Sequence, residues 1–186
     1  MSRISLFDPS HAEGESKELF ETIQGSFGIV PNVFRVFGSS AAALKGYLNF
    51  NSALSGGLLP SSLREQLALT VSEINGCDYC LSAHSFFGGK VGLSHQEIDA
   101  ARHAKAIDEK NNAALEFARA VTVSRGRVAN SEVAAVRAAG FTDAELLEIV
   151  SHVSLTTLTN YVNNVAETEI DFPIVAASSS FAENAS

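Results

Sequence analysis

The two cysteines of this 186-residue chain lie close together, and a histidine follows them. They are Cys77 and Cys80 in the segment NGCDYCLSAHSFFG, residues 75–88, and the histidine is His84. Positions i, i+3 and i+7 lie within about 60° of one another around an α-helix, so a helix here would place all three side chains on one face. Such a face can be a redox centre or a metal site, or it can hold two buried thiols beside an unrelated imidazole.

The position of the thiols favours the redox interpretation. Asn75 and Gly76 are predicted to end one helix, so both cysteines fall in the first turn of the next. The unpaired N–H groups and the helix dipole of a first turn stabilise an anion, which lowers the pKa of a thiol from about 8.5. A thiolate is a nucleophile for an O–O bond, and a second thiol can then close a disulfide. A purely structural disulfide is disfavoured, because the loop that it closes is tiny.

The metal interpretation has weaker support. The C-x2-C-x3-H arrangement supplies three ligands, which is enough for catalytic zinc. The chain has no further cysteine, however, and nothing in the spacing of His95 or His103 indicates a fourth ligand. Haem attachment requires a histidine directly after the second cysteine, and Leu81 stands there. We therefore predict no metal site and no organic cofactor.

Two glutamates precede the cysteines and are candidates to assist them. A hairpin through residues 75–76 would run its two helices antiparallel. Glu65 lies about 15 Å before the turn and His84 about 12 Å after it, so the two would be side by side and Glu65 could orient His84. A capping box with Ser62 is a second role predicted for Glu65. Glu73 would lie level with the thiols, and a solvated charge at the helix end is the interpretation that we favour for it.

Helical periodicity extends over almost the whole chain, and alternating apolar and polar runs of useful length are nearly absent. Ser94 with Glu97 and Thr142 with Glu145 form predicted capping boxes, and Asn32 is a predicted cap for a short helix after Pro31. The other segments predicted to be helical are residues 14–28, 41–57, 59–76, 93–105, 109–124, 130–140 and 141–169, and a further helix is predicted to begin at the cysteines. This pattern predicts an all-α fold built from helix hairpins.

Composition limits the classes of partner. Apolar residues make up 46% of the chain and charged residues 18%, and the net charge is -8. The basic residues are scattered, so we expect no nucleic-acid partner. No apolar stretch has the roughly 18 residues of a membrane span, and the N-terminal segment lacks the apolar core of a secretory signal. We therefore expect a cytoplasmic protein without a membrane partner.

The chain should form one domain over residues 1–172, with the core motif at residues 60–90 and a loose tail at residues 173–186.

Several other side chains have simpler expected roles. His152 lies in an apolar stretch and is predicted to be a hydrogen-bonded interior histidine. Phe86 and Phe87 are predicted to lie in the core or in a pocket wall. Tyr47 and Tyr161 are candidates to line a substrate cavity, on their aromatic character alone.

The segment REQLALTVSEINGCDYCLSAH, residues 64–84, resembles the core motif of the carboxymuconolactone decarboxylase-like superfamily, specifically of its AhpD-like alkylhydroperoxidase branch. That motif has a glutamate, a C-x2-C pair twelve residues later, and a histidine four residues beyond the pair. Glu65, Cys77, Cys80 and His84 stand at these positions. The segments GIVPNVFRVFGSSAAALKGYL and NYVNNVAETEIDFP are also similar to peroxidase-related members, so the resemblance extends over about residues 15–175.

The resemblance implies an all-α homotrimer or homohexamer and a catalytic mechanism. Cys80 would attack the terminal oxygen of a hydroperoxide as a thiolate and become a sulfenic acid. Cys77 would then attack that sulfur and close a disulfide. His84, held by Glu65, would relay the proton that Cys80 loses. An external dithiol or lipoyl-type reductant would have to reopen the disulfide.

The chain departs from the family pattern between the cysteines. The best-characterised peroxidases of this branch carry a further histidine directly before the second cysteine, where this chain has Tyr79. A phenol cannot act as a base near neutral pH, and the charge of Asp78 opposes thiolate formation. Both residues indicate a slower peroxidase or a different substrate. Lactone decarboxylation is disfavoured, because the true carboxymuconolactone decarboxylases generally lack the cysteine pair.

We therefore predict a thiol-dependent peroxidase that reduces alkyl hydroperoxides and uses Cys80, Cys77, His84 and Glu65. Its partners would be a small-molecule hydroperoxide and an external dithiol. The alternative is a non-catalytic oligomeric redox sensor, or a thiol oxidoreductase with a different substrate. Sustained turnover with a dithiol distinguishes catalysis from sensing, because a sensor oxidises only once.

Overall fold

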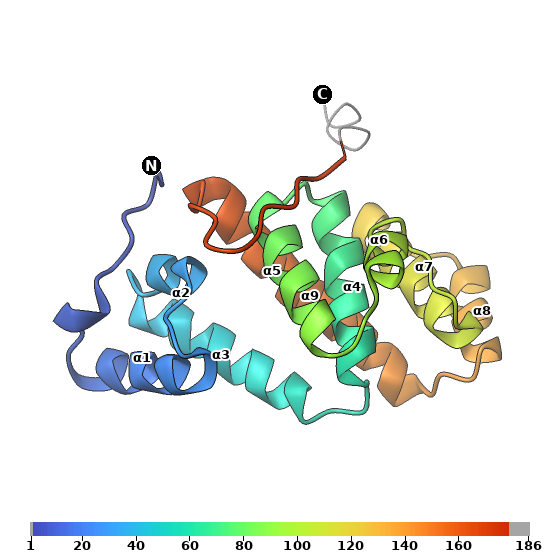
Figure 1. Ribbon diagram of the computed structural model, residues 1–186. Helices are drawn as coiled ribbons and strands as arrows, with labels where there is room; N and C mark the ends of the chain where they lie inside the picture. The colour runs from blue at the N-terminus through green and yellow to red at the C-terminus, as the bar shows by residue number, and fades with distance from the viewer. Residues whose placement is uncertain (1, 179–186) are drawn as a thin grey trace.

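A computed structural model describes residues 2–178, and its regular structure is helical (Figure 1). No strand occurs between these residues, which confirms the all-α prediction. None of the helices in this part of the chain is long and apolar enough to cross a membrane. A 3-10 turn at Pro9–His11 precedes α1 (Gly14–Phe27), α2 (Asn32–Phe37), α3 (Ala41–Ser55), α4 (Ser61–Ile74), α5 (Asp78–Lys90), α6 (His95–Arg102), α7 (Glu109–Ser124), α8 (Asn130–Ala138) and α9 (Asp143–Ala166).

The helix α4 lies at the centre of the molecule. It contacts α5, α6, α7 and α9, and Figure 1 shows it between α5 and the group formed by α6, α7 and α8. Leu63, Leu67 and Val71 recur at helical spacing along it and are almost completely buried. They belong to the larger apolar core, which α4 shares with α7 and α9. The glutamate and cysteine motif is therefore carried by the best-packed hairpin of the fold.

The longest helix, α9, forms a wall common to both parts of the molecule. It contacts α4, α5 and α7 in the larger core, and α2 and α3 at the N-terminal end. In Figure 1 it passes behind α4 and α5. A second, smaller core joins α1, α2 and α3 and includes Phe20, Phe34 and Phe37. The cysteine hairpin and the N-terminal helices α2 and α3 thus both pack against α9.

Two of the predicted capping boxes are confirmed and two other cap predictions are wrong. The boxes Ser94–Glu97 and Thr142–Glu145 are both present. At α4 the N-cap is instead Pro60, because the helix begins at Ser61, and Glu65 then lies beyond reach of the cap. At α2 the N-cap is Pro31 rather than Asn32.

The described part of the predicted tail, residues 173–178, is hydrogen-bonded to the hairpin. The backbone N–H of Val175 donates to the hydroxyl of Ser82 at 2.9 Å, and that of Ala177 donates to the Asp78 carboxylate at 2.8 Å. These acceptors are side chains of α5, which sequence periodicity does not identify as partners of a distant segment. Residues 179–186 of the predicted tail lie outside the described residues.

Candidate active site

The turn between α4 and α5 places the cysteine pair. Gly76 has a φ of 60°, a backbone conformation that glycine adopts without strain. Cys77 then caps α5, and the N–H of Cys80 donates to its sulfur at 3.2 Å. The two sulfurs form a disulfide, with 5.3 Å between the Cα atoms. The prediction that the pair sits at the start of a helix is confirmed.

The two sulfurs differ in their access to the surroundings. Cys77 is fully buried, whereas Cys80 is 3% exposed and lines a cavity of about 320 Å³. The amide nitrogen of Asn163 on α9 lies 3.3 Å from the sulfur of Cys80 and donates to it. A donor at this position favours a negative charge on that sulfur. Cys80 is therefore the sulfur that a small molecule in the cavity can meet.

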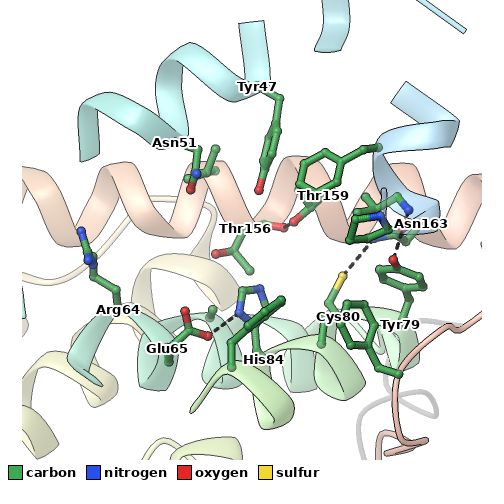
Figure 2. A pocket seen from close by; sticks show the side chains of 18 of the residues that line it. Tyr47, Asn51, Arg64, Glu65, Tyr79, Cys80, His84, Thr156, Thr159 and Asn163 are labelled. Carbon is green, nitrogen blue, oxygen red and sulfur yellow. Dashed lines mark hydrogen bonds and ion pairs between the residues drawn. The ribbon is translucent and has the colours of Figure 1, made fainter. Parts of the chain in front are cut away.

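His84 and Glu65 also line this cavity, as Figure 2 shows. Nδ1 of His84 lies 2.8 Å from the carboxylate of Glu65, across the antiparallel pair α4 and α5. The predicted side-by-side arrangement of these two residues is confirmed. The carboxylate fixes the orientation of the ring and leaves Nε2 as the nitrogen for exchange with the cavity.

The cavity lies between α9, the hairpin and the N-terminal helices. In Figure 2 Tyr47 and Asn51 enter from α3, Thr156, Thr159 and Asn163 from α9, and Glu65, His84 and Cys80 from the hairpin. The wall also contains aromatic side chains, namely Phe27, Phe34, Phe87 and Phe172. Tyr47 and Phe87 are therefore in the cavity wall, as predicted. Tyr161 is 59% exposed and is not part of the wall, because it lies on the outer face of α9.

Tyr79, which lies between the cysteines, is held in place by two hydrogen bonds of its hydroxyl group. Its hydroxyl donates to Asp171 at 2.8 Å and accepts from the N–H of Val33 at 3.1 Å. Burial, together with the Asp171 carboxylate, raises the pKa of Tyr79 well above its ordinary value. The phenol stays protonated and connects α5 to α2 and to the segment after α9. It cannot act as a base in the way that a histidine at this position could.

The environment of Glu73 differs from the one predicted. Its side chain is completely buried and is not a solvated charge at the end of α4. Its carboxylate accepts from Nε of Arg102 at 2.7 Å and from the N–H of Ser178 at 2.7 Å. Burial raises the pKa of Glu73, yet the bonds from Arg102 and Ser178 outweigh it and leave the pKa below its ordinary value. Glu73 therefore holds α6 and the C-terminal segment against α4.

The Glu73→Gln variant is expected to lose about 3 kcal/mol of stability at pH 7, because Arg102 loses the partner of its charge. The folded-state pKa lies below the unfolded value of about 4.5. The contribution of the carboxylate is therefore complete above that value and is lost as the pH falls through the folded pKa. Urea unfolding at pH 7 and pH 3 measures the difference, which should shrink in acid. Glu116→Gln, at an exposed ion pair with Lys105, is the control and should change stability by about 0.5 kcal/mol or less.

His152 is buried as predicted, but the prediction that it is hydrogen-bonded is wrong for Nε2. This atom has no protein partner among the described residues, and the side chain lines the cavity. Burial and the nearby guanidinium of Arg64 lower the pKa of His152 to about 4, so the ring is neutral at pH 7.

Asn163 is the site residue that sequence reasoning missed. The available signal was its spacing, because it lies eleven positions after His152 on one face of α9.

The described residues contain no group of three or more histidine, cysteine, aspartate or glutamate side chains placed to hold a metal ion. Cys77 and Cys80 are joined to each other, and His84 is joined to Glu65. The cysteine pair, with a histidine and carboxylate pair beside it, can support thiol and disulfide exchange.

Comparisons with known proteins find a family match and several similar folds. Residues 41–123 match the model of the carboxymuconolactone decarboxylase family. No curated protein matches the sequence significantly. A peroxidase-related protein with an alkylhydroperoxidase AhpD core from Ralstonia eutropha JMP134 has a similar structure, with 24% identity, a TM-score of 0.84, and coverage of 91% of this chain and 92% of that chain. A peroxidase-related protein from Silicibacter sp. TM1040 has 24% identity, a TM-score of 0.79, and coverage of 89% and 88%.

A third similar structure is the debrominase Bmp8, with 19% identity, a TM-score of 0.77, and coverage of 90% of this chain and 91% of that chain. A cysteine-to-alanine variant of Bmp8 has been solved with 2,3,4-tribromopyrrole. These likenesses establish a shared helical fold over almost the whole length of the chain.

Proposed function

We propose that this chain is a member of the AhpD-like and carboxymuconolactone decarboxylase superfamily and a thiol-dependent peroxidase that reduces organic hydroperoxides. One observation carries the proposal. The sulfur of Cys80 and the His84–Glu65 pair line the same cavity, and Cys77 lies within disulfide distance behind Cys80. A nucleophile, a base and a resolving thiol are the three groups that such a reaction needs.

The first step is the attack of the Cys80 thiolate on the terminal oxygen of the hydroperoxide. The S–O bond forms as the O–O bond breaks, and the alcohol leaves after taking up a proton. Cys80 is oxidised by two electrons to a sulfenic acid. His84 accepts the thiol proton, directly or through one water molecule, and can return it to the leaving alkoxide. Asn163, which donates to the sulfur of Cys80, stabilises the thiolate before attack.

The second step regenerates the structure described above. Cys77 attacks the sulfur of Cys80, the S–S bond forms, and the S–O bond breaks with release of water. An external dithiol or lipoyl-type reductant then returns two electrons through thiol–disulfide exchange. The overall reaction converts one hydroperoxide and one dithiol into an alcohol, water and a disulfide. The small opening at Cys80 and the full burial of Cys77 favour Cys80 as the sulfur that the reductant attacks.

The test is the consumption of cumene hydroperoxide by the purified protein with excess dithiol. The proposal predicts many peroxide molecules consumed per chain, at a rate well above that of the dithiol alone. A redox sensor, the alternative from a different class, would consume one equivalent and stop. A rate equal to the dithiol blank would contradict the peroxidase proposal for this substrate.

A second candidate is a thiol oxidoreductase that reduces a different substrate with the same cysteine pair. Two observations favour it. Tyr79 is bound to Asp171 and Val33 and cannot assist as a base, and the cavity wall is rich in aromatic rings. The structurally similar Bmp8 is a debrominase. Bromide release from 2,3,4-tribromopyrrole in the presence of dithiol, without peroxide turnover, would favour this candidate.

We also propose that the chain assembles as a homotrimer or homohexamer. An apolar stripe on the outer face of α9 supports this assembly, because Leu158, Tyr161 and Val165 recur at helical spacing and are each at least 42% exposed. A second copy of the chain is the partner that would cover such a stripe. Sedimentation equilibrium measures the mass of the assembly. The expected result is three or six chains, which Tyr161→Glu should shift towards the monomer, and a wild-type monomer would contradict the proposal.

A further inference from the structure

The inner face of α9 carries a row of polar side chains along the cavity. His152, Thr156, Thr159 and Asn163 follow one another at intervals of four, three and four residues, which places them within about 60° around the helix axis. All four are more than nine-tenths buried, and all four line the cavity. The row extends about 16 Å along the helix. Figure 2 shows Thr156, Thr159 and Asn163 facing the hairpin that carries Cys80.

Two atoms at the ends of this row have no hydrogen-bond partner among the described residues. They are Nε2 of His152 and the side-chain oxygen of Asn163. Asn160, on another face of the same helix, is different, because its amide is bonded to both Ser72 and Asn75. Buried polar atoms without partners are rare and costly in proteins. Both His152 and Asn163 line the cavity, where a bound molecule can supply the missing bonds.

The charged side chains that line the cavity already have partners within the protein. Glu65 is paired with His84, and Arg64 donates to two carbonyl groups at the end of α3. The ammonium group of Lys90 lies over an aromatic ring, 5.3 Å from its centre. Much of the remaining wall consists of aromatic and apolar side chains. Such a cavity suits an uncharged molecule with a flat apolar body and hydrogen-bonding groups on the side of α9.

We infer that the cavity binds an uncharged molecule about two rings long, with one polar group at Asn163 and another at His152. A molecule with two polar groups about 10 Å apart, extended by a hydrogen bond of about 3 Å at each end, can reach both ends of this row of about 16 Å. The group at Asn163 lies beside Cys80 and is therefore the reactive one. This inference rests on the proposed function in one respect, since the substrate of a peroxidase would carry its hydroperoxide group at this end. His152 and Asn163 determine the specificity for such a substrate.

Binding of two unreactive probes to the disulfide form tests the inference without turnover. The probes are 4,4′-dihydroxybiphenyl, which has a polar group at each end, and 4-hydroxybiphenyl, which has only one. Titration calorimetry of the wild type should give a dissociation constant about fivefold to tenfold lower for the first probe, the value of one additional hydrogen bond. His152→Leu and Asn163→Leu should each bring this ratio close to one. Ser154→Ala, on the exposed face of α9, is the matched control and should keep the wild-type ratio.

Stability distinguishes a binding role of His152 from a structural one. Replacing a buried polar atom that has no partner with an apolar group is neutral or stabilising. The melting temperature of His152→Leu should therefore not fall below that of the wild type, while His152→Gln should recover part of the probe preference. A large loss of melting temperature in His152→Leu would show that Nε2 serves the fold and would overturn the inference. An unchanged probe ratio in both leucine variants, or no binding of either probe to the wild type, would also overturn it.

The result separates this inference from the proposed function. Selective binding of the two-ended probe that depends on His152 and Asn163 supports the site, whether or not peroxide is consumed. Peroxide turnover with an unchanged probe ratio supports the peroxidase and contradicts the inference. Selective binding without peroxide turnover contradicts the peroxidase and supports a different substrate for the same cavity.

Discussion

The Cys80→Ser variant is expected to lose peroxide turnover by about 10³-fold or more, because the hydroxyl that replaces the thiol is a far weaker nucleophile at neutral pH. Cys80 is the cysteine that meets the cavity, and Asn163 donates to its sulfur. The measurement is the rate of cumene hydroperoxide consumption with excess dithiol, after circular dichroism has shown that the variant is folded.

Cys77→Ser is the matched control for this prediction, because both variants lose the disulfide. Cys77 is fully buried and is the proposed resolving thiol. Its variant should react with one equivalent of peroxide at close to the wild-type rate and then stop or turn over slowly. If Cys77→Ser lost this first reaction and Cys80→Ser kept it, the roles of the two cysteines would be reversed.

The second large effect is expected at the pair formed by His84 and Glu65. His84→Asn should lower peroxide turnover by about 10² to 10⁴-fold at pH 7, the usual range for the loss of a general base. Glu65→Gln should lower it by about 10²-fold, since the ring loses the carboxylate that orients it at 2.8 Å. His103→Asn, at the exposed end of α6, is the control and should leave the rate unchanged.

The pH profile distinguishes a base from a residue that only shapes the cavity. A cysteine thiol ionises without help above its ordinary pKa of about 8.5. The deficit of His84→Asn should therefore narrow as the pH rises from 7 to 9.5, because the base is no longer needed. A deficit that stays constant over this range would assign His84 a structural role.

The fold and the centre of the site were predictable from the sequence because they depend on local patterns. Helical periodicity predicts the helices, and the turn at Gly76 runs α4 and α5 antiparallel. Once these are given, the rise of a helix brings Glu65 level with His84. The pair at 2.8 Å follows from spacing within one hairpin.

The features that sequence reasoning missed depend on contacts between distant segments. Glu73 is at a helix end, and only the approach of Arg102 and of residue 178 buries it. The segment after Pro173 has the composition of a tail, yet side chains of α5 hold its backbone. Asn163 reaches Cys80 across 83 positions in the chain. No periodicity within one helix predicts which distant helix its polar face will meet.

Tyr79 illustrates the same limit at the level of function. The sequence shows that a phenol, Tyr79, stands directly before the second cysteine. It does not show that the phenol is bonded to Asp171 and to the backbone of Val33. These bonds give Tyr79 a structural role, and the proposed mechanism assigns proton transfer to the His84–Glu65 pair.

Trapping the first oxidised intermediate tests the proposed mechanism most directly. Reduced Cys77→Ser protein is mixed with one equivalent of cumene hydroperoxide and with dimedone, which reacts with sulfenic acids, and the labelled peptide is identified by mass spectrometry. The mechanism predicts one dimedone adduct per chain, on Cys80, and none when the peroxide is omitted. Complete consumption of the peroxide by this variant without an adduct on Cys80, or a folded and fully reduced protein that leaves the peroxide unreacted, would contradict it.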